Sequence, residues 1–226
     1  MNLTIDIGNS GSKCALFDKA GRIVRYWPSV EAIPDECLQQ ADAAIVCASG
    51  RMPAFIQHFP SHIPLHVLTA QSRLPLRIDY LTPETLGADR IAAACGAWHR
   101  YPNQHSVVID SGTCITIDWV DADGTFRGGA ILPGIEMRYK ALNNYTDRLP
   151  LLNMEGASES PCGRSTEQCM RAGVLQAVQY EIAGFIDYYQ SLCGSVAVVS
   201  TGGIPLLPNT DKMLVMSGLN EILQIN

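Results

Sequence analysis

Ile5-Asp6-Ile7-Gly8, near the start of the chain, has a near copy at Ile109-Asp110-Ser111-Gly112. Each stretch closes an apolar run that predicts a buried strand, and a second strand follows each of them. A turn then comes at nearly the same offset, Asp18–Gly21 in the first half and Asp121–Gly124 in the second. This repeated strand–acid–glycine–strand–turn–strand unit indicates two duplicated domains, although β-hairpins can also resemble one another by chance.

Strands and helices alternate in the rest of both halves, which predicts an α/β fold. We expect helices over 34–40, within 53–64, and over 89–100, 134–144 and 165–192, and strands over 43–48, 65–68 and 195–200. The tail, 213–225, is expected to form a strand and a last helix. The two domains then cover 1–104 and 105–226, joined near 101–105 with a cleft between them.

The composition describes a globular chain with few charges. Its 226 residues are 47% hydrophobic and 17% charged, and the formal net charge is −6. An acidic surface repels phosphate backbones, so nucleic-acid binding is disfavoured. No stretch approaches the roughly 18 apolar residues of a membrane span, and Asp6 interrupts the apolar run that a signal peptide needs. The 8 cysteines are scattered without a Cys-x-x-Cys motif, which favours reduced thiols in the cytoplasm.

The first candidate site is the segment Asp6-Ile7-Gly8-Asn9-Ser10-Gly11-Ser12-Lys13. Its glycines let backbone N–H groups approach a phosphate, and Lys13 and the hydroxyl groups can add direct contacts. The carboxylate of Asp6, at the end of the strand, can hold a metal ion or a water molecule. By itself the segment is weak evidence for such a site, because Asp-Ile-Gly-Asn is also typical of an ordinary turn.

Asp110-Ser111-Gly112-Thr113 repeats this arrangement in the second half. Because a carboxylate and a phosphate repel each other, a cation is required between them. Two facing acid–glycine loops with an ion between them would form a clamp for a nucleoside triphosphate. Thr201-Gly202-Gly203, after another buried strand, is either a tight turn or a flat backbone surface for adenine or ribose.

Gly87-Ala88-Asp89-Arg90, at the start of the helix expected over 89–100, allows two interpretations. Asp is a favoured N-cap residue, and Arg90 could simply pair with an acid on the surface. Alternatively, Asp89 is a general base and Arg90 is a two-pronged donor to an anionic substrate.

Three histidines, His58, His62 and His66, have the i, i+4, i+8 spacing that would align metal ligands on one helix. Pro60 and Pro64 lie between them and would break that helix, so we expect no metal site there.

Taken in order, these segments resemble the type III pantothenate kinases, a family of the acetate and sugar kinase/Hsp70/actin superfamily. The resemblance rests on Asp6-x-Gly8-Asn9, Pro83-Glu84-x-x-Gly87-Ala88-Asp89-Arg90, Asp110-x-Gly112-Thr113, Gly128-Gly129-Ala130-Ile131-x-Pro133-Gly134 and Thr201-Gly202-Gly203. It covers nearly the whole chain. It implies two ribonuclease-H-like (actin-like ATPase) domains with a nucleotide cleft between them.

The resemblance also implies an activity, the ATP-dependent phosphorylation of pantothenate to 4'-phosphopantothenate in coenzyme A biosynthesis. It makes Asp89 the base that accepts the proton of the substrate's primary hydroxyl. ATP binding is assigned to Asp6, Ile7, Gly8, Asn9, Ser10, Gly11, Ser12, Lys13 and Thr113. Substrate binding is assigned to Tyr80, Gly87, Ala88, Asp89, Arg90 and Thr166, with Arg90 suited to the pantothenate carboxylate.

By the same resemblance, Asp110 matches the ligand of a monovalent cation, K⁺ or NH₄⁺, which the family uses besides Mg²⁺. The family is cytoplasmic and homodimeric, with the substrate pocket near the subunit interface. Two differences from the usual family pattern are expected to affect ATP affinity and the first domain. Residues 112–116 read Gly-Thr-Cys-Ile-Thr in place of Gly-Thr-Ala-Thr-Thr, and 48–53 replace a segment that commonly ends in Ser-Val-Val-Pro.

Two other functions compete with this one. One is a kinase of the same superfamily that acts on a sugar or a carboxylic acid, although sugar kinases have different signatures at the position of Gly87–Arg90. The other is a nucleotide-dependent switch or filament protein, for which 226 residues leave little room beyond the two domains.

Overall fold

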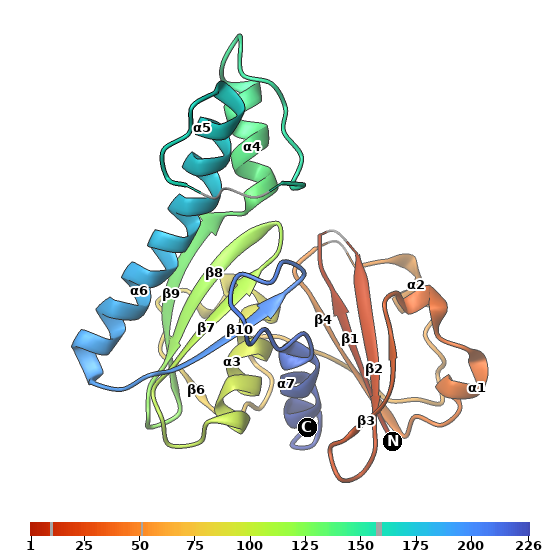
Figure 1. Ribbon diagram of the computed structural model, residues 1–226. Coiled ribbons are helices and arrows are strands. Elements are labelled where there is room, and N and C mark those ends of the chain that lie inside the picture. Colours follow the sequence, from red (N-terminus) through yellow and green to blue (C-terminus); the bar gives the residue numbers. More distant parts are fainter. Residues whose placement is uncertain (10, 51, 157–159) are drawn as a thin grey trace.

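Two sheets of five strands each form the centre of the molecule (Figure 1). The computed structural model describes residues 1–9, 11–50, 52–156 and 160–226. In the first sheet, β1 (Asn2–Ile7), β2 (Ser12–Phe17) and β3 (Ile23–Trp27) form an antiparallel meander, and β4 (Ala43–Ala48) and β5 (Leu65–Val67) continue the sheet in parallel. The strand order is β3-β2-β1-β4-β5.

The second sheet repeats that arrangement. It contains β7 (Ser106–Ser111), β8 (Cys114–Val120) and β9 (Thr125–Pro133) as an antiparallel meander, with β10 (Ala197–Gly202) parallel to β7. Its order is β10-β7-β8-β9-β6. Read from the other end, the four strands β9-β8-β7-β10 correspond to β3-β2-β1-β4 of the first sheet. Asp6 and Asp110 therefore occupy equivalent positions, each near the carboxyl end of a central strand.

Strand β6 (Arg77–Ile78) joins the second sheet although it lies in the first half of the chain. Sequence analysis did not predict it, because two residues are too short to show a strand pattern. The division into domains over 1–104 and 105–226 stays a prediction.

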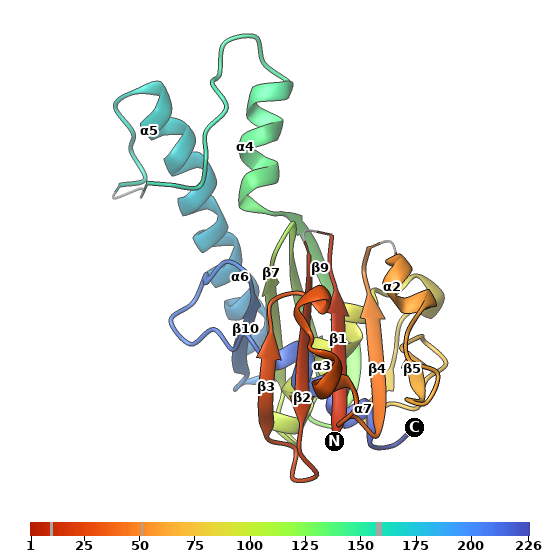
Figure 2. The same ribbon diagram turned by 90° about the vertical axis from the view of Figure 1, so that its right-hand side faces the viewer.

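Helices α3 (Ala88–Arg100) and α7 (Leu214–Leu223) lie between the two sheets (Figures 1 and 2). They pack closely, since a Cβ on Gly218 would lie 1.8 Å from the Ala92 carbonyl oxygen and one on Gly96 would lie 2.3 Å from that of Leu214. One core unites them with both sheets; the sheets contribute Ala15, Phe17, Ile45, Cys47, Val108, Val120, Phe126 and Val199. The two halves therefore share buried surface rather than standing apart.

The tail differs from its prediction. Residues 213–225 were expected to form a strand and then a helix, and the expected strand is wrong. Leu214, Val215, Leu219 and Ile222 are buried at helical spacing in α7, which packs against α3, β1 and β4. The tertiary contact with α3 thus favours helix throughout this apolar segment.

The remaining helices lie outside this centre. They are the 3₁₀ turns η1 (Val30–Ala32) and η2 (Pro83–Thr85), and helices α1 (Asp35–Leu38), α2 (Ala54–Gln57), α4 (Ile135–Asn144), α5 (Thr166–Arg171) and α6 (Ala177–Cys193). The single helix expected over 165–192 is interrupted by a π-helical turn, η3 (Ala172–Gln176), between α5 and α6. In Figures 1 and 2, α4 and α5 project beyond the second sheet.

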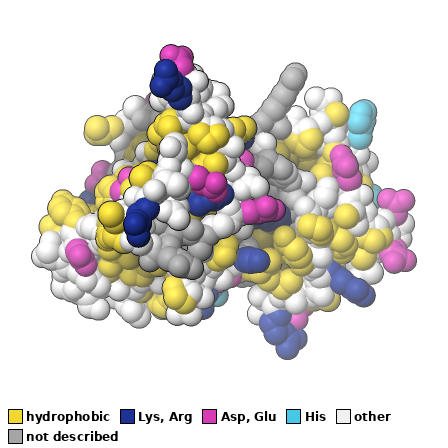
Figure 3. All heavy atoms as spheres, turned by 45° about the horizontal axis from the view of Figure 1, so that its top comes forward, with side chains coloured by type: hydrophobic (Ala, Val, Ile, Leu, Met, Phe, Trp, Pro, Cys, Tyr) yellow, Lys and Arg dark blue, Asp and Glu magenta, His cyan; other side chains and the backbone are white. Residues whose placement is uncertain are grey.

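The charges on the surface are sparse. On the face shown in Figure 3, separate acidic and basic side chains lie among hydrophobic and uncharged ones. Within the described parts of the chain, no helix has the length and apolar character to cross a membrane.

Candidate active site

Three carboxylates come together where the two sheets and α3 meet. Asp6 and Asp110 are the next-to-last residues of β1 and β7, and Asp89 lies in the first turn of α3. The charge of Asp89 raises the pKa of both Asp6 and Asp110, and the charge of Asp6 raises that of Asp110. The structure thus brings three acids into one site, although Asp6 and Asp110 are 104 positions apart in the sequence.

A backbone hydrogen bond links Gly8 and Gly11 in the first loop. The Gly8 N–H donates to the Gly11 carbonyl oxygen at 2.9 Å. The end of β4 supports this turn, because a Cβ on Gly50 would lie 3.3 Å from both the Gly8 carbonyl oxygen and Asn9 Oδ1. The Ser12 hydroxyl accepts a hydrogen bond from the Val30 N–H at 3.0 Å. Of the ATP-binding residues expected in this loop, Ser10 lies outside the described residues.

Lys13 supplies a positive charge beside the carboxylates. It lies on β2 directly opposite Asp6 of β1. Its charge lowers the pKa of both Asp6 and Asp110 and so partly offsets their mutual repulsion. A lysine in this position can also contact a phosphate, as the sequence indicated.

Burial raises the pKa of the Asp6 carboxyl above its ordinary value of 3.8. The thiol of Cys47, directly opposite on β4, opposes that rise by donating a hydrogen bond to Asp6 Oδ1 at 3.4 Å. Sequence analysis did not single out Cys47 as a member of the site. The contact depends on the register of two parallel strands, for which the sequence carries no local signal.

The second loop is enclosed by glycines. A Cβ on Gly134 would lie 2.4 Å from the Thr113 carbonyl oxygen, and the Gly134 N–H donates to that oxygen at 3.1 Å. Gly202 has a φ of +99°, and a Cβ there would lie 2.3 Å from the Ser111 carbonyl oxygen and 2.6 Å from Asp110 Oδ1. Gly134 and Gly202 thus lie so close to the backbone of this loop that neither position can carry a side chain without displacing it.

Asp110 is the most strongly perturbed acid of the site. Burial, followed by the charges of Asp89 and Asp6, raises its pKa from 3.8 to about 7. Such a carboxyl is stabilised in its ionised form by any cation that binds beside it. Within the described residues, no three acids, histidines or cysteines are grouped closely enough to form a metal site by themselves.

Asp89 is not the N-cap of its helix. Gly87 is the N-cap residue, Ala88 begins α3, and Asp89 follows with Oδ1 accepting a hydrogen bond from the Arg90 N–H at 2.9 Å. A Cβ on Gly87 would lie 2.5 Å from Asp89 Oδ1, so this glycine leaves space for the carboxylate. The N-terminus of the helix stabilises the negative charge of Asp89 without a capping role.

Arg90 is buried rather than presented freely to solvent. It is 7% exposed and bonds to Asp118 of β8, which is 1% exposed. Its charged group also lies over the rings of Tyr80 at 5.8 Å and Phe126 at 5.7 Å. The expected contact between Arg90 and a substrate carboxylate stays a prediction, and the structure adds Asp118 as a partner that sequence analysis missed.

The glycines of the Gly128-Gly129 pair make room for this cluster. A Cβ on Gly128 would lie 3.5 Å from the Tyr80 ring, and Gly128 has a φ of +85°. A Cβ on Gly129 would lie 1.9 Å from the Ile117 carbonyl oxygen and 2.8 Å from Asp118 Oδ1. Strand β9 can therefore pass the Arg90–Asp118 pair only with glycine at position 129.

Thr166 lies apart from the other expected substrate-binding residues. It begins α5, which lies beyond the second sheet and away from α3 in both ribbon views (Figures 1 and 2).

The histidines His58, His62 and His66 do not lie on one helix, because α2 ends at Gln57 and His66 lies on β5.

Comparisons with known proteins agree with this geometry. The family model for type III pantothenate kinase matches residues 2–188. The chain belongs to the type III pantothenate kinase family. A type III pantothenate kinase of Phocaeicola vulgatus is 38% identical over 242 residues, covering 100% of this chain and 99% of that protein. One from Cytophaga hutchinsonii is 36% identical over 241 residues and covers 100% of both chains.

Solved structures confirm the expected fold class of an actin-like ATPase with two mixed sheets. A Campylobacter jejuni protein described as a member of the Baf family of transcriptional activators has a TM-score of 0.61 at 23% identity, covering 99% of this chain and 98% of that one. The activator of 2-hydroxyisocaproyl-CoA dehydratase from Clostridium difficile, with bound ADPNP, has a TM-score of 0.50 at 13% identity, covering 99% and 96%. At these identities the likeness concerns the fold alone.

Proposed function

We propose that this type III pantothenate kinase family member transfers the γ-phosphate of ATP to the primary hydroxyl of pantothenate, the first step of coenzyme A biosynthesis. The observation that carries the proposal is the meeting of Asp6, Asp110 and Asp89 at one site between the two sheets. Asp6 and Asp110 each precede a glycine loop suited to phosphates, and Asp89 belongs to the expected substrate-binding segment Gly87–Arg90. The reaction is expected to take place in the cytoplasm.

The phosphate groups of ATP lie between the two loops in this proposal. Asn9 and Gly11 offer backbone N–H groups, while the Gly8 N–H closes the loop by donating to the Gly11 carbonyl oxygen. Lys13 offers a positive charge, and Thr113 contributes from the second loop. Catalysis of phosphoryl transfer depends mainly on positioning and on electrostatic stabilisation of the oxygens of the transferred group. The Gly8–Gly11 hydrogen bond and the position of Lys13 on β2 prepare this site for phosphate in the proposal.

The acidic residues fit the binding of cations. Asp6 and Asp110 are partly buried, repel each other and have raised pKa values. A positive charge between them would therefore reduce the electrostatic repulsion present in the protein without bound cations. We assign Asp110 to a monovalent cation, K⁺ or NH₄⁺, and expect Mg²⁺ to accompany the phosphates near Asp6. Bound cations supply charge neutralisation at the phosphate oxygens.

Asp89 is assigned as the general base. Its carboxylate lies beside both acids and at the N-terminus of α3, where it stays available as an acceptor. It orients the primary hydroxyl and accepts its proton as that oxygen attacks the γ-phosphorus. Tyr80, Gly87, Ala88 and Arg90 surround the rest of the substrate in this assignment.

The proposed activity is tested by measuring ADP release from the purified protein with ATP, Mg²⁺ and KCl. We expect turnover with pantothenate and background rates with glucose or acetate, the acceptors of the alternative kinases. Turnover with glucose or acetate, without turnover of pantothenate, would contradict the proposal and support the alternative.

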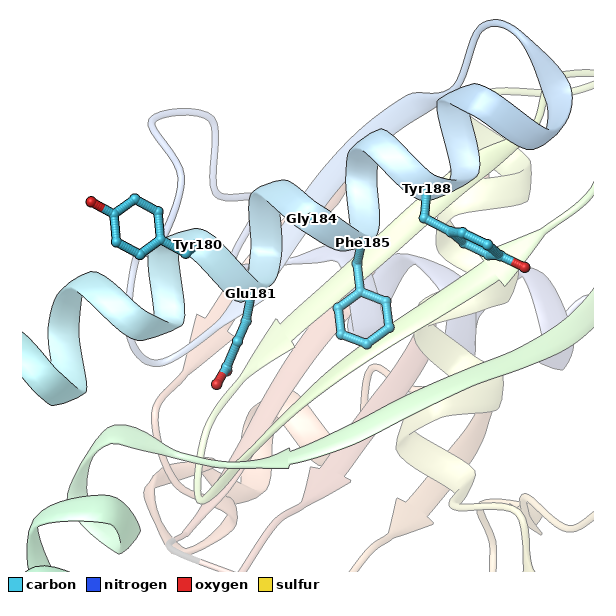
Figure 4. A pocket seen from close by; sticks show the side chains of 5 residues that line it. All are labelled: Tyr180, Glu181, Gly184, Phe185 and Tyr188. Atoms are coloured by element: carbon cyan, nitrogen blue, oxygen red, sulfur yellow. The ribbon is translucent and has the colours of Figure 1, made fainter.

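We further propose a homodimer built on α6. Tyr180, Tyr188 and Leu192 are 63%, 59% and 55% exposed, an apolar and aromatic surface typical of interfaces. In Figure 4, Phe185 points toward the second sheet while Tyr180 points away from it, and the hollow that they line has a volume of about 400 Å³. A second copy would also be needed to bring a Thr166 to the substrate, because α5 lies apart from α3 within one chain.

The dimer is tested by light scattering coupled to gel filtration. We expect the unmodified protein to elute as a dimer and the double variant Tyr180→Glu/Tyr188→Glu to elute as a monomer with strongly reduced pantothenate turnover. Val24→Glu, which adds a charge at a 49% exposed aliphatic residue of β3, is the control and should remain dimeric. A monomeric unmodified protein with full activity would contradict this part of the proposal.

A further inference from the structure

Asp118 and Arg90 form an ion pair with a defined geometry. Arg90 Nε lies 3.2 and 3.1 Å from the two carboxylate oxygens of Asp118, and Nη2 lies 2.5 Å from Oδ1. Asp118 therefore holds one edge of the guanidinium, the edge formed by Nε and Nη2. The guanidinium is also hydrogen-bonded to Tyr80. Because it has five N–H donors in a rigid plane, the edge opposite Asp118, with Nη1 and the second Nη2 hydrogen, can still serve a further acceptor.

The surroundings fix this plane further. The rings of Tyr80 and Phe126 lie against the guanidinium, and their centroids are 6.1 Å apart at an angle of 57°. Gly129 brings β9 against the Asp118 carboxylate, as described above. Arg90 thus has little rotational freedom, and its orientation is decided chiefly by the acid that holds it.

The pair is also ionised. Burial acts to lower the pKa of Arg90, but the hydrogen bonds and charges of Asp118 and, to a smaller extent, of Tyr80 together outweigh burial and raise it. Burial raises the pKa of Asp118, and Arg90 opposes that rise. Because the two charges cancel, Arg90 offers an incoming anion directed hydrogen bonds rather than a large net attraction.

We propose that Asp118 is a positioning residue of this kinase: by holding the Nε–Nη2 edge of Arg90, it presents the opposite edge to the carboxylate of the substrate. The inference rests on the proposed contact between Arg90 and that carboxylate. Asp118 would then contribute to the preference for an anionic over a neutral substrate, although it does not touch the substrate itself. A neutral amide of pantothenic acid, which lacks the carboxylate, presents only a neutral carbonyl acceptor to this edge and so gains no charge-assisted contact from it.

The test compares KM for pantothenate, for its N-alkyl amide and for ATP in the unmodified protein and in Asp118→Asn. Losing a charge-assisted contact costs about 1.5–3 kcal/mol, so KM for pantothenate should rise about 10-fold or more. KM for the amide and for ATP should change less than about threefold on the same reasoning. In the Arg90→Met background, adding Asp118→Asn should change KM for pantothenate less than about twofold, because the two residues act through one contact.

Asp121→Asn is the matched control. Asp121 follows β8, is 5% exposed and bonds to Arg127 Nε at 2.7 Å, but it lies in the turn between β8 and β9 rather than beside Arg90. We expect its KM values to equal those of the unmodified protein. If Asp118→Asn does not fold, Asp118→Glu keeps the charge pair while displacing Arg90, and KM for pantothenate should again rise more than KM for the amide.

Equal changes in all three KM values, or full additivity with Arg90→Met, would overturn the inference and leave Asp118 with a structural role only. An unchanged KM for pantothenate in a folded Asp118→Asn or Asp118→Glu variant would also overturn it. Failure of the proposed function can be told apart from failure of this inference. If the proposed function is wrong, the unmodified protein itself will not phosphorylate pantothenate.

Discussion

Asp89→Asn is expected to fold with an unchanged thermal midpoint and to lose about 10³-fold in kcat for pantothenate phosphorylation. The amide keeps the shape of the side chain and can still accept the Arg90 N–H at Oδ1, so α3 is not disturbed. It cannot accept the proton of the substrate hydroxyl. The loss is measured as the initial rate of ADP release at saturating ATP and pantothenate.

Glu136→Gln provides the control for helix stabilisation. Glu136 is the second residue of α4 after the N-cap Gly134, the same position that Asp89 has in α3 after Gly87. A first-turn acid contributes about 0.3–1 kcal/mol through the helix dipole. Glu136→Gln should therefore change stability slightly and leave the rate unaffected. A near-normal rate in Asp89→Asn would show that Asp89 has only this stabilising role.

Asp110→Asn is expected to abolish the response to potassium and, at the same time, to stabilise the fold. Unmodified protein should turn over pantothenate faster in KCl than in NaCl, whereas the variant should show a low rate that is the same in both salts. A potassium dependence that persists in the variant would remove Asp110 from the cation site.

The stabilisation follows from the raised pKa of Asp110. Between its ordinary pKa of 3.8 and its folded-state pKa of about 7, the folded protein holds a proton that the unfolded chain has released. Ionised Asp110 therefore destabilises the fold, with the effect absent below about pH 4, increasing up to about pH 7 and constant above it. A shift of about three pKa units corresponds to about 4 kcal/mol.

The thermal midpoint of Asp110→Asn, measured without K⁺ or nucleotide, should exceed that of the unmodified protein by several degrees at pH 8 and equal it near pH 4. The charges of Asp89, Asp6 and Asp118 raise the pKa of Asp110 and that of Lys13 lowers it, and these interactions are lost in the variant together with the cost of burying the charge. For Asp121→Asn the change in thermal midpoint at pH 8 should have the opposite sign. Hydrogen bonds from Arg127 and the backbone outweigh burial and lower the pKa of Asp121, so its ionised form stabilises the fold. A lower midpoint for Asp110→Asn at pH 8 would contradict this account.

The meanders and their acid–glycine loops were predictable because their signals are local. Alternating apolar residues, turn residues and a carboxylate at a strand end all lie within a few positions of each other in 5–21 and 109–124. The repeat then indicated that Asp6 and Asp110 belong to equivalent strands, and both sheets have the same central strand order.

The partners of these residues were not predictable in the same way. The contacts of Cys47 with Asp6 and of Asp118 with Arg90 join separate elements, and they depend on strand register and on the packing of α3 against the second sheet. One signal for Asp118 was present, since a lone acid in the apolar strand Cys114–Val120 requires a buried partner. The strand expected at the start of 213–225 was wrong because the contact of this apolar segment with α3 favours helix from Leu214 onward.

The most direct test of the account is the identity of the product formed by the unmodified protein. Phosphorus NMR of a reaction with ATP, Mg²⁺, KCl and pantothenate should show a new phosphate monoester coupled to the methylene protons of the former primary hydroxyl. The signal should be absent with Asp89→Asn over the same period. ADP formed without this monoester, or a phosphorylated sugar or acid from the alternative acceptors alone, would contradict the account.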